Sequence, residues 1–430
     1  MKVENEKQPK NLIKLTIELN PDEIKPYLLS AASRLSERTE IPGFRPGKAP
    51  YDLVKQRFGE AAIYEEAAEE VVKKTYIEAV LEQKLEVIGR PQIQIQKMAP
   101  GNPLIYTATV ALMPEVKLGD YQKLKTRKKK AEVKPEELKK TMAELRKMRA
   151  KETLANRPAQ TGDKVEIDFE LSIDGVPVDG GSNKKFPVVL GENRLVPGFE
   201  KNLIGLKADD KKDFQLEYPK EYFQKNLAGR KVDCSAKVNA VYQIELPAWD
   251  DAFAKLLGSF KNIQEVEEKI EVNLKAEADH EEEHRFEREL LKEIIDRTEF
   301  GEIPEILLEA EGQRMMAEFK SGIEERGIKY SDYLEHLKKS EAEIAKDFQP
   351  QAVNRIKSAL VLRAIRLKEN ITVDTSQLEK EIAKQKEVYK NDLDTYNKID
   401  SPEYRDQYEE MLLNRKVFDY LESLINPPNK

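Results

Sequence analysis

Residues 41–50 read "IPGFRPGKAP", a stretch that separates two segments with helical spacing. Its prolines fix the φ angle and its glycines permit turns that other residues resist, so the loop is stiff before it meets a partner. Phe44 supplies an apolar anchor, and Arg45 and Lys48 supply cations that suit carboxylate or phosphate. An ordinary helix–helix turn is the alternative, but such a turn rarely needs three prolines or a displayed ring. The sequence predicts a docking loop.

The flanking segments predict a small α+β domain over residues 1–114. Apolar residues alternate in 11–19, as in a half-buried strand, and a helix opens after Asn20. Helical spacing resumes from Tyr51 to about Gln83. Alternating apolar residues near 93–95 and 106–112 then predict two further strands.

The rest of the chain changes character twice. Residues 115–158 are charged and are expected to form a mostly helical linker. A β-rich domain is expected over 159–246, where alternating segments are separated by turn residues. Residues 247–430 predict amphipathic helical arms joined by short turns, with punctuation that includes Pro350. The predicted fold class is multidomain α+β: an N-terminal α+β domain, an inserted β-rich domain and elongated all-α C-terminal arms.

Composition narrows the class of protein. The chain has 430 residues with a net charge of −7, so bulk charge does not indicate a nucleic-acid binder, and any RNA contact needs a local patch. The run Lys128–Lys130 is interpreted as a solvated linker face. One cysteine, Cys234, excludes an internal disulfide, and no apolar run approaches a membrane span or a signal peptide. A cytoplasmic protein without membrane contact is expected.

Two motifs partly match the patterns of known enzyme sites, but the surrounding residues argue against both sites. The loop resembles a phosphate-binding P-loop, but only three residues separate Gly43 from Gly47, and Ala49 replaces the required Ser or Thr. His280 and His284 satisfy the H-E-x-x-H pattern of zinc proteases, yet their segment is charged on nearly every side. A carboxylate as third zinc ligand stays open, but a solvated helix face is favoured. No cofactor and no metal are expected.

The loop resembles the ribosome-binding signature of the bacterial trigger factor family, and the domain order resembles that family from end to end. The resemblance implies docking beside the exit tunnel, against ribosomal protein and rRNA phosphates, and shielding of nascent and unfolded polypeptides without ATP. It implies a monomer on the ribosome and leaves open a homodimer in free solution. The implied ribosome-binding residues are Gly43, Phe44, Arg45, Gly47, Lys48 and Pro50.

The β-rich segment resembles FKBP-type peptidyl-prolyl isomerases in "FPVVLGENRLVPGFEKNLIGLKADD" and "EYFQKNLAGRKV". The resemblance implies an apolar pocket that twists the prolyl amide without a nucleophile. Val178 and Cys234 stand where that family has aromatic residues, which predicts reduced isomerase activity. Two alternatives stay open: these residues form only the core of a binding module, or the whole protein is a dedicated isomerase whose flanking domains recruit substrate. The implied pocket residues are Phe169, Asp179, Phe186, Leu195, Val196, Phe199 and Tyr222.

The helical arms carry large apolar residues on charged helices. Most of them are expected to form internal core, and the family resemblance implies that the arms also form a cradle for unfolded chains. Methionine and leucine suit such loose recognition because they repack around varied sequences. These residues are Met315, Met316, Phe319, Leu334, Leu337, Leu360, Leu362 and Ile365.

Overall fold

The computed structural model describes residues 1–39, 41–222, 224 and 227–425. The chain divides into two compact units, each described here by itself. One unit contains Met1–Lys128 together with the chain from His284 onward, and the other contains Lys129–Glu283. No helix among the described residues is long and apolar enough to cross a membrane.

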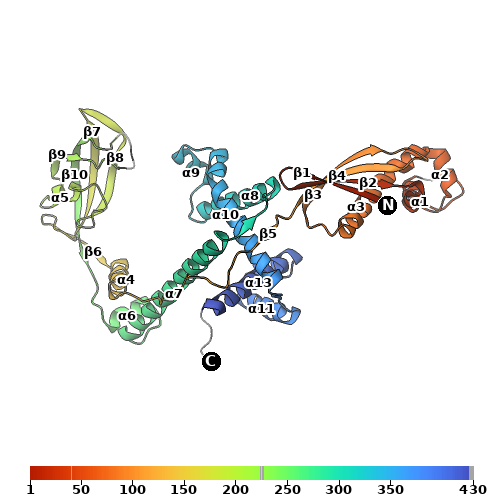
Figure 1. Ribbon diagram of the computed structural model, residues 1–430. Helices are drawn as coiled ribbons and strands as arrows, with labels where there is room; N and C mark the ends of the chain where they lie inside the picture. Colours follow the sequence, from red (N-terminus) through yellow and green to blue (C-terminus); the bar gives the residue numbers. More distant parts are fainter. Residues whose placement is uncertain (40, 223, 225–226, 426–430) are drawn as a thin grey trace, which may run out of the picture. The chain divides into compact units, whose positions relative to one another are not determined.

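The N-terminal domain is an antiparallel four-stranded sheet in the order β1-β2-β4-β3, packed against helices (Figure 1). Every second residue of β2 is buried, which confirms the predicted strand and buries its apolar face against the helices. The strands are β1 (Lys2–Gln8), β2 (Leu12–Leu19), β3 (Val87–Lys97) and β4 (Leu104–Leu112), and the helices are α1 (Pro21–Arg38), α2 (Tyr51–Phe58) and α3 (Glu60–Glu82).

Two details of this domain differ from the sequence-based expectation. The sheet has an additional edge strand, β1, whose charged and mostly exposed residues give no apolar alternation to detect. The single helix expected from Tyr51 to Gln83 is two helices, because Gly59 takes a φ angle of 83° that ends α2 and starts α3.

The β-rich domain is a five-stranded antiparallel sheet built around one long strand, β10 (Lys231–Glu245). β10 pairs along its length with three strands, which are β6 (Lys151–Leu154), β7 (Lys164–Ile173) and β9 (Lys211–Glu217). β8 (Val176–Val189) pairs with the other edge of β7. The short helix α5 (Phe199–Leu203) packs its buried Phe199 and Leu203 against the apolar face of this sheet.

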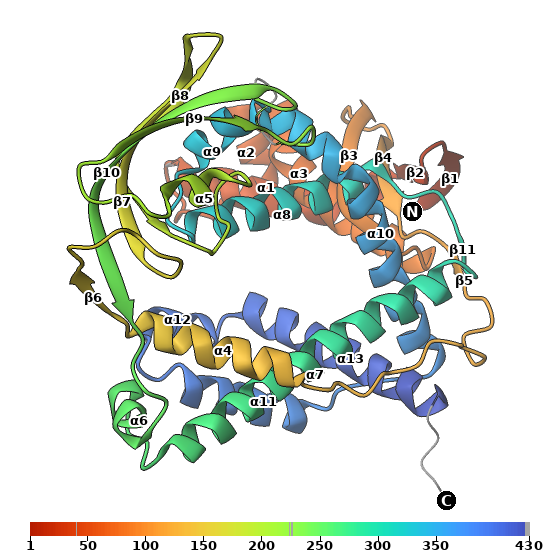
Figure 2. The ribbon, with the colours of Figure 1, turned by 90° about the vertical axis from the view of Figure 1, so that its left-hand side faces the viewer.

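The chain after this domain is helical, as predicted, apart from the two-residue strand β11 (Glu299–Phe300), which pairs with β5 (Val116–Lys117). α8 and α10 pack side by side (Figure 2). Pro350 lies inside α10, so its predicted role as a break is wrong. The helices are α6 (Asp251–Leu257), α7 (Ile263–Ile295), α8 (Glu305–Glu324), α9 (Tyr330–Leu337), α10 (Glu341–Lys368), α11 (Thr375–Val388), α12 (Leu393–Lys398) and α13 (Pro402–Ile425).

The segment 115–158 was expected to be mostly helical, and this is wrong. Only α4 (Pro135–Met148) is a helix, and it packs against the first half of α7. Residues 118–134 have no regular structure, and several of their polar groups bond to α7 and the turn after it. The Glu293 carboxylate accepts hydrogen bonds from the backbone amides of Lys125 and Thr126, each at 3.0 Å.

Candidate functional site

The predicted docking loop is built from two consecutive β-turns. The amide of Phe44 donates to the carbonyl of Ile41 at 3.1 Å, and the amide of Lys48 donates to the carbonyl of Arg45 at 2.9 Å. Each turn has proline at its second position and glycine at its third, and the φ angles of Gly43 and Gly47 are 86° and 78°. Pro-Gly at these positions is typical of a type II turn, so the local sequence alone specifies the shape of the loop.

The two turns place the ring of Phe44 outward. Ile41 is buried in the core of its domain at 8% exposure, whereas Phe44, three residues later, is 40% exposed. Arg45 and Lys48 are also exposed, and neither forms an ion pair with any residue that the structure describes. An apolar ring and two uncompensated cations therefore share one rigid tip.

The helices α1 and α3, which support the loop, are joined by ion pairs. Arg34 of α1 contacts Glu66 at 3.0 Å and Glu70 at 2.5 Å, both on α3. Hydrogen bonds from Lys74 and then Arg34 lower the pKa of Glu70 to about 2. The hydroxyl of Ser33 donates to the carbonyl of Gly47 at 2.9 Å, which ties the loop to α1. These contacts fix the loop relative to α1 and fix α1 relative to α3.

In the β-rich domain, three of the predicted pocket residues form one aromatic cluster. Phe169 of β7 lies edge-to-face with Phe186 of β8 at a centroid distance of 5.6 Å and with Phe199 of α5 at 5.8 Å. Such pairs stabilise their own geometry beyond the apolar area they bury. Leu195 and Val196 belong to the same apolar core, in the loop before α5.

Glu200 holds the loop that carries Leu195 and Val196. Its carboxylate is 5% exposed and accepts the backbone amides of Gly191, Asn193 and Arg194 at 2.7, 3.0 and 2.8 Å. A buried carboxylate needs hydrogen-bond partners, and these three amide donors supply them, so Glu200 fixes the backbone of the loop.

The other two predicted pocket residues, Tyr222 and Asp179, lie outside the cluster formed by Phe169, Phe186 and Phe199. Tyr222 packs edge-to-face on Tyr218 at 4.9 Å, and burial raises the pKa of its hydroxyl. Asp179 is exposed on β8 and is not a member of the apolar core. The structure therefore gathers the apolar residues of the predicted set and leaves the one carboxylate outside the core.

Sequence reasoning missed Phe214 of β9, whose ring contacts that of Phe199 at 5.3 Å. The alternation of Phe214 and Leu216 along β9, continued by Tyr218 just after it, was a usable signal, because all three belong to the apolar core. Of the two residues that depart from the family pattern, Val178 packs at the edge of the same core and Cys234 is 2% exposed within it. Burial raises the pKa of the Cys234 thiol to about 11.

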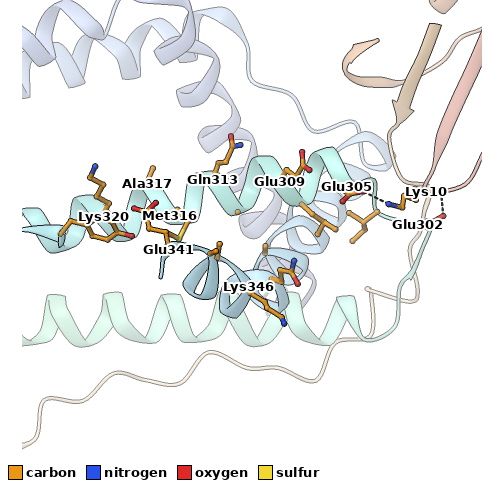
Figure 3. Close-up of a pocket in the computed structure, with 18 residues that line it drawn as sticks. Lys10, Glu302, Glu305, Glu309, Gln313, Met316, Ala317, Lys320, Glu341 and Lys346 are labelled. Atoms are coloured by element: carbon orange, nitrogen blue, oxygen red, sulfur yellow. Dashed lines mark hydrogen bonds and ion pairs between the residues drawn. The ribbon is translucent and has the colours of Figure 1, made fainter. Parts of the chain in front are cut away.

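A cavity of about 1050 Å³ lies along α8 and α10 (Figure 3). Its apolar lining includes Leu308, Met316 and Ala345, and its rim carries charges of both signs. Lys10, in the turn between β1 and β2, reaches this rim, where its amide contacts Glu302 at 2.9 Å and its ammonium contacts Glu305 at 2.7 Å.

The expectation that most of the singled-out arm residues are core holds for half of them, since four of the eight are buried. Phe319 is ringed by edge-to-face contacts with Tyr330, Tyr333 and Phe348. Leu337 is the exposed exception, at 40%. The buried members are Met315, Leu360, Leu362 and Ile365, and the half-buried ones are Met316, Phe319 and Leu334.

The H-E-x-x-H segment lies in the middle of α7. His280 and His284 are both exposed, and the Nδ1 atom of His284 lies 3.6 Å from the carboxylate of Glu287. Within the described residues, no three His, Cys, Asp or Glu side chains are grouped as metal ligands.

Three family descriptions match successive parts of the chain. Residues 1–145 match bacterial trigger factor protein, residues 155–247 match FKBP-type peptidyl-prolyl cis-trans isomerase, and residues 262–423 match the trigger factor C-terminus. The FKBP-type match begins four residues before the predicted domain start at 159, close to the end of β6.

Curated relatives are similar over almost the full length. Trigger factors from Geobacillus kaustophilus, Bacillus pumilus and Caldicellulosiruptor saccharolyticus are 33%, 32% and 30% identical. Each alignment covers 98% of this chain and 96–99% of the relative. A solved trigger factor chaperone covers 99% of the chain at 23% identity, with a TM-score of 0.47. On the extent of the curated matches, the chain belongs to the trigger factor family and carries an FKBP-type domain between its N-terminal and C-terminal parts.

Proposed function

We propose that this protein is an ATP-independent chaperone that docks beside the ribosomal exit tunnel through residues 41–50 and shields nascent chains as they emerge. The observation that carries the proposal is the 40% exposure of Phe44 on a loop whose backbone is fixed by two turns. An exposed ring on a stiff support loses little entropy when a partner buries it.

Charge supports the same partner. The chain carries a net charge of −7, so it is repelled by RNA as a whole, yet Arg45 and Lys48 present cations without ion-pair partners among the described residues. Arg45 suits a bidentate contact with an rRNA phosphate or a ribosomal carboxylate. Ribosome docking in turn places the protein in the cytoplasm, as a monomer at each tunnel.

Client binding is assigned to the arms. The cavity along α8 and α10 combines an apolar floor with a charged rim, as expected for a surface that holds apolar segments of varied sequence. Each contact with a client is weak, and several together retain it, so release needs no nucleotide.

The FKBP-type domain is assigned prolyl isomerase activity on X-Pro bonds, whose uncatalysed exchange takes tens to hundreds of seconds. The clustered rings of Phe169, Phe186 and Phe199 support this assignment. The alternative function, a dedicated isomerase with recruiting domains, requires no ribosome contact.

Cosedimentation with ribosomes at several salt concentrations tests the docking proposal. The double variant Phe44→Ala/Arg45→Ala is expected to lose cosedimentation while its activity on short prolyl peptides stays unchanged. The matched control is Lys25→Ala/Leu29→Ala, which removes one exposed cation and one exposed apolar side chain from α1 of the same domain. Full cosedimentation of the loop variant would reject docking through this loop and favour the dedicated isomerase.

A further inference from the structure

The central strand of the FKBP-type sheet carries small side chains where its neighbours carry large ones. Cys234 of β10 lies directly opposite Phe214 of β9 on one side and Leu171 of β7 on the other. Two residues along β10, Ala236 lies opposite Phe169. Directly opposed residues of antiparallel strands face the same side of the sheet, so all five side chains belong to its apolar face.

The ring of Phe199 is held between the two flanking strands. It lies 5.3 Å from the ring of Phe214 and 5.8 Å from the ring of Phe169, in both cases edge-to-face with an interplanar angle of 78°. Phe199 comes from α5, which crosses the apolar face, and it is 4% exposed. Two edge-to-face contacts from opposite strands fix both the position and the tilt of one ring.

The size of residue 234 permits this arrangement. A thiol occupies far less volume than a phenyl ring, and protein interiors are packed with few voids larger than a water molecule. A phenylalanine at 234 would therefore compete with Phe214 for space beside Phe199. The small Cys234 on β10 leaves space beside Phe199, and the ring of Phe214 on β9 fills that space.

We propose that Phe214 is a positioning residue of the prolyl isomerase site, holding Phe199 against the substrate, and that the small Cys234 is required for this role. The inference rests on the proposed isomerase activity of the domain. It contradicts the simpler view that Cys234 only widens and weakens the site, and the two views differ in the sign of one effect. If a ring is merely missing, then Cys234→Phe should raise catalysis; if Phe214 already fills its place, the same change should lower catalysis.

The test uses the full-length chain and a chromogenic tetrapeptide with a central X-Pro bond. Phe214→Leu, which keeps most of the side-chain volume, is expected to lower kcat about threefold with KM little changed, because it loosens a group that acts in the transition state. Cys234→Phe is expected to lower kcat by about the same factor. The exchange variant Phe214→Ala/Cys234→Phe moves the ring across the strand pair and should recover kcat to within about twofold of the parent. Glu217→Gln, an exposed change on the same strand, is the control.

Each outcome separates the hypotheses. Unfolding midpoints of all variants show whether a loss of kcat follows from unfolding, and a purely structural role predicts that kcat falls only where the midpoint falls. An active parent, an impaired Phe199→Leu and an unaffected Phe214→Leu would overturn this inference alone, as would a rise in kcat for Cys234→Phe. A parent chain that does not catalyse isomerisation would overturn the isomerase assignment together with this inference.

Discussion

The hydroxyl of Tyr121 donates a 2.6 Å hydrogen bond to the carboxylate of Glu369, which joins two residues that are 248 positions apart in the chain. Tyr121 is 2% exposed within the core formed by α7, α10 and α13. Burial and then the Glu369 carboxylate raise the pKa of the Tyr121 hydroxyl, so it stays a donor at all physiological pH values. This contact holds the irregular segment 118–134 at its start to the helical region.

Tyr121→Phe is expected to destabilise the unit that contains the helical arms by about 1–2 kcal/mol, because the ring stays while a hydrogen bond to a charged group is lost. Urea unfolding followed by far-UV circular dichroism measures the change. Tyr389→Phe, at a residue that is 39% exposed, is the control and should leave stability unchanged. Equal stability of the two variants would mean that the bond contributes nothing.

Acid should destabilise the FKBP-type domain through Asp163. This carboxylate is 4% exposed and is held by both terminal nitrogens of Arg157, at 2.6 and 2.9 Å. The Arg157 hydrogen bond holds the pKa of Asp163 below its usual value. A carboxyl with a lowered folded-state pKa stabilises the fold above its unfolded pKa of about 3.9, and this stability is lost as pH falls through the folded value.

Arg157→Met should therefore cost roughly 1–3 kcal/mol at pH 7 and flatten the fall in stability below about pH 4. Thermal unfolding between pH 2 and pH 7 records both effects. Arg230→Met, which removes an exposed arginine that has no ion pair with any residue the structure describes, should give the parental pH profile. A profile for Arg157→Met that parallels the parent's would contradict this prediction.

The stiffness of the docking loop can be tested without removing a contact group. Gly43→Ala and Gly47→Ala each place a Cβ at a positive φ angle, at a cost of about 1 kcal/mol, so each should weaken ribosome binding at least about fivefold. The Cβ at Gly47 also comes within 2.6 Å of the Glu37 side chain, so the effect there should be the larger. Gly322→Ala, within α8 and without neighbours near its added Cβ, is the control. Parental binding by both loop variants would show that turn geometry is not needed.

Cys234 is expected to be unreactive in the folded chain. It is 2% exposed and burial raises its thiol pKa to about 11, so at pH 8 the thiolate is a small fraction of the total. Alkylation by iodoacetamide should be at least about 100-fold slower than in 6 M guanidinium chloride. Comparable rates would show that β9 and β10 separate in solution.

Sequence patterns predicted the elements whose conformation is determined by their own local residues. The Pro-Gly pairs of residues 41–50 determine their own turns, and the alternation in β2 reports a face that is buried. β1 has no such signal, because it pairs through its backbone at the edge of a sheet and exposes most of its side chains.

The errors have a common physical cause in long-range contacts. The charged composition of 118–134 favours helix locally, yet its amides bond to Glu293 and its Tyr121 is buried against α10, so tertiary contacts prevail over propensity. Pro350 is accommodated within α10 because packing against α8 stabilises the helix around it. Phe214 was not predicted as a site residue because the sequence of β9 is that of an ordinary half-buried strand. Only the fold brings the ring of Phe199 beside it.

The pairing of β6 with the end of β10 brings Lys151 opposite Glu245, so the chain passes into and out of the FKBP-type domain through adjacent backbone positions. A domain whose two ends lie close together can be inserted into another chain without separating the residues on either side of it. Such a domain can be gained, exchanged or lost in evolution while the rest of the fold is kept. The FKBP-type domain and the loop of residues 41–50 are accordingly free to evolve at different rates within one gene product.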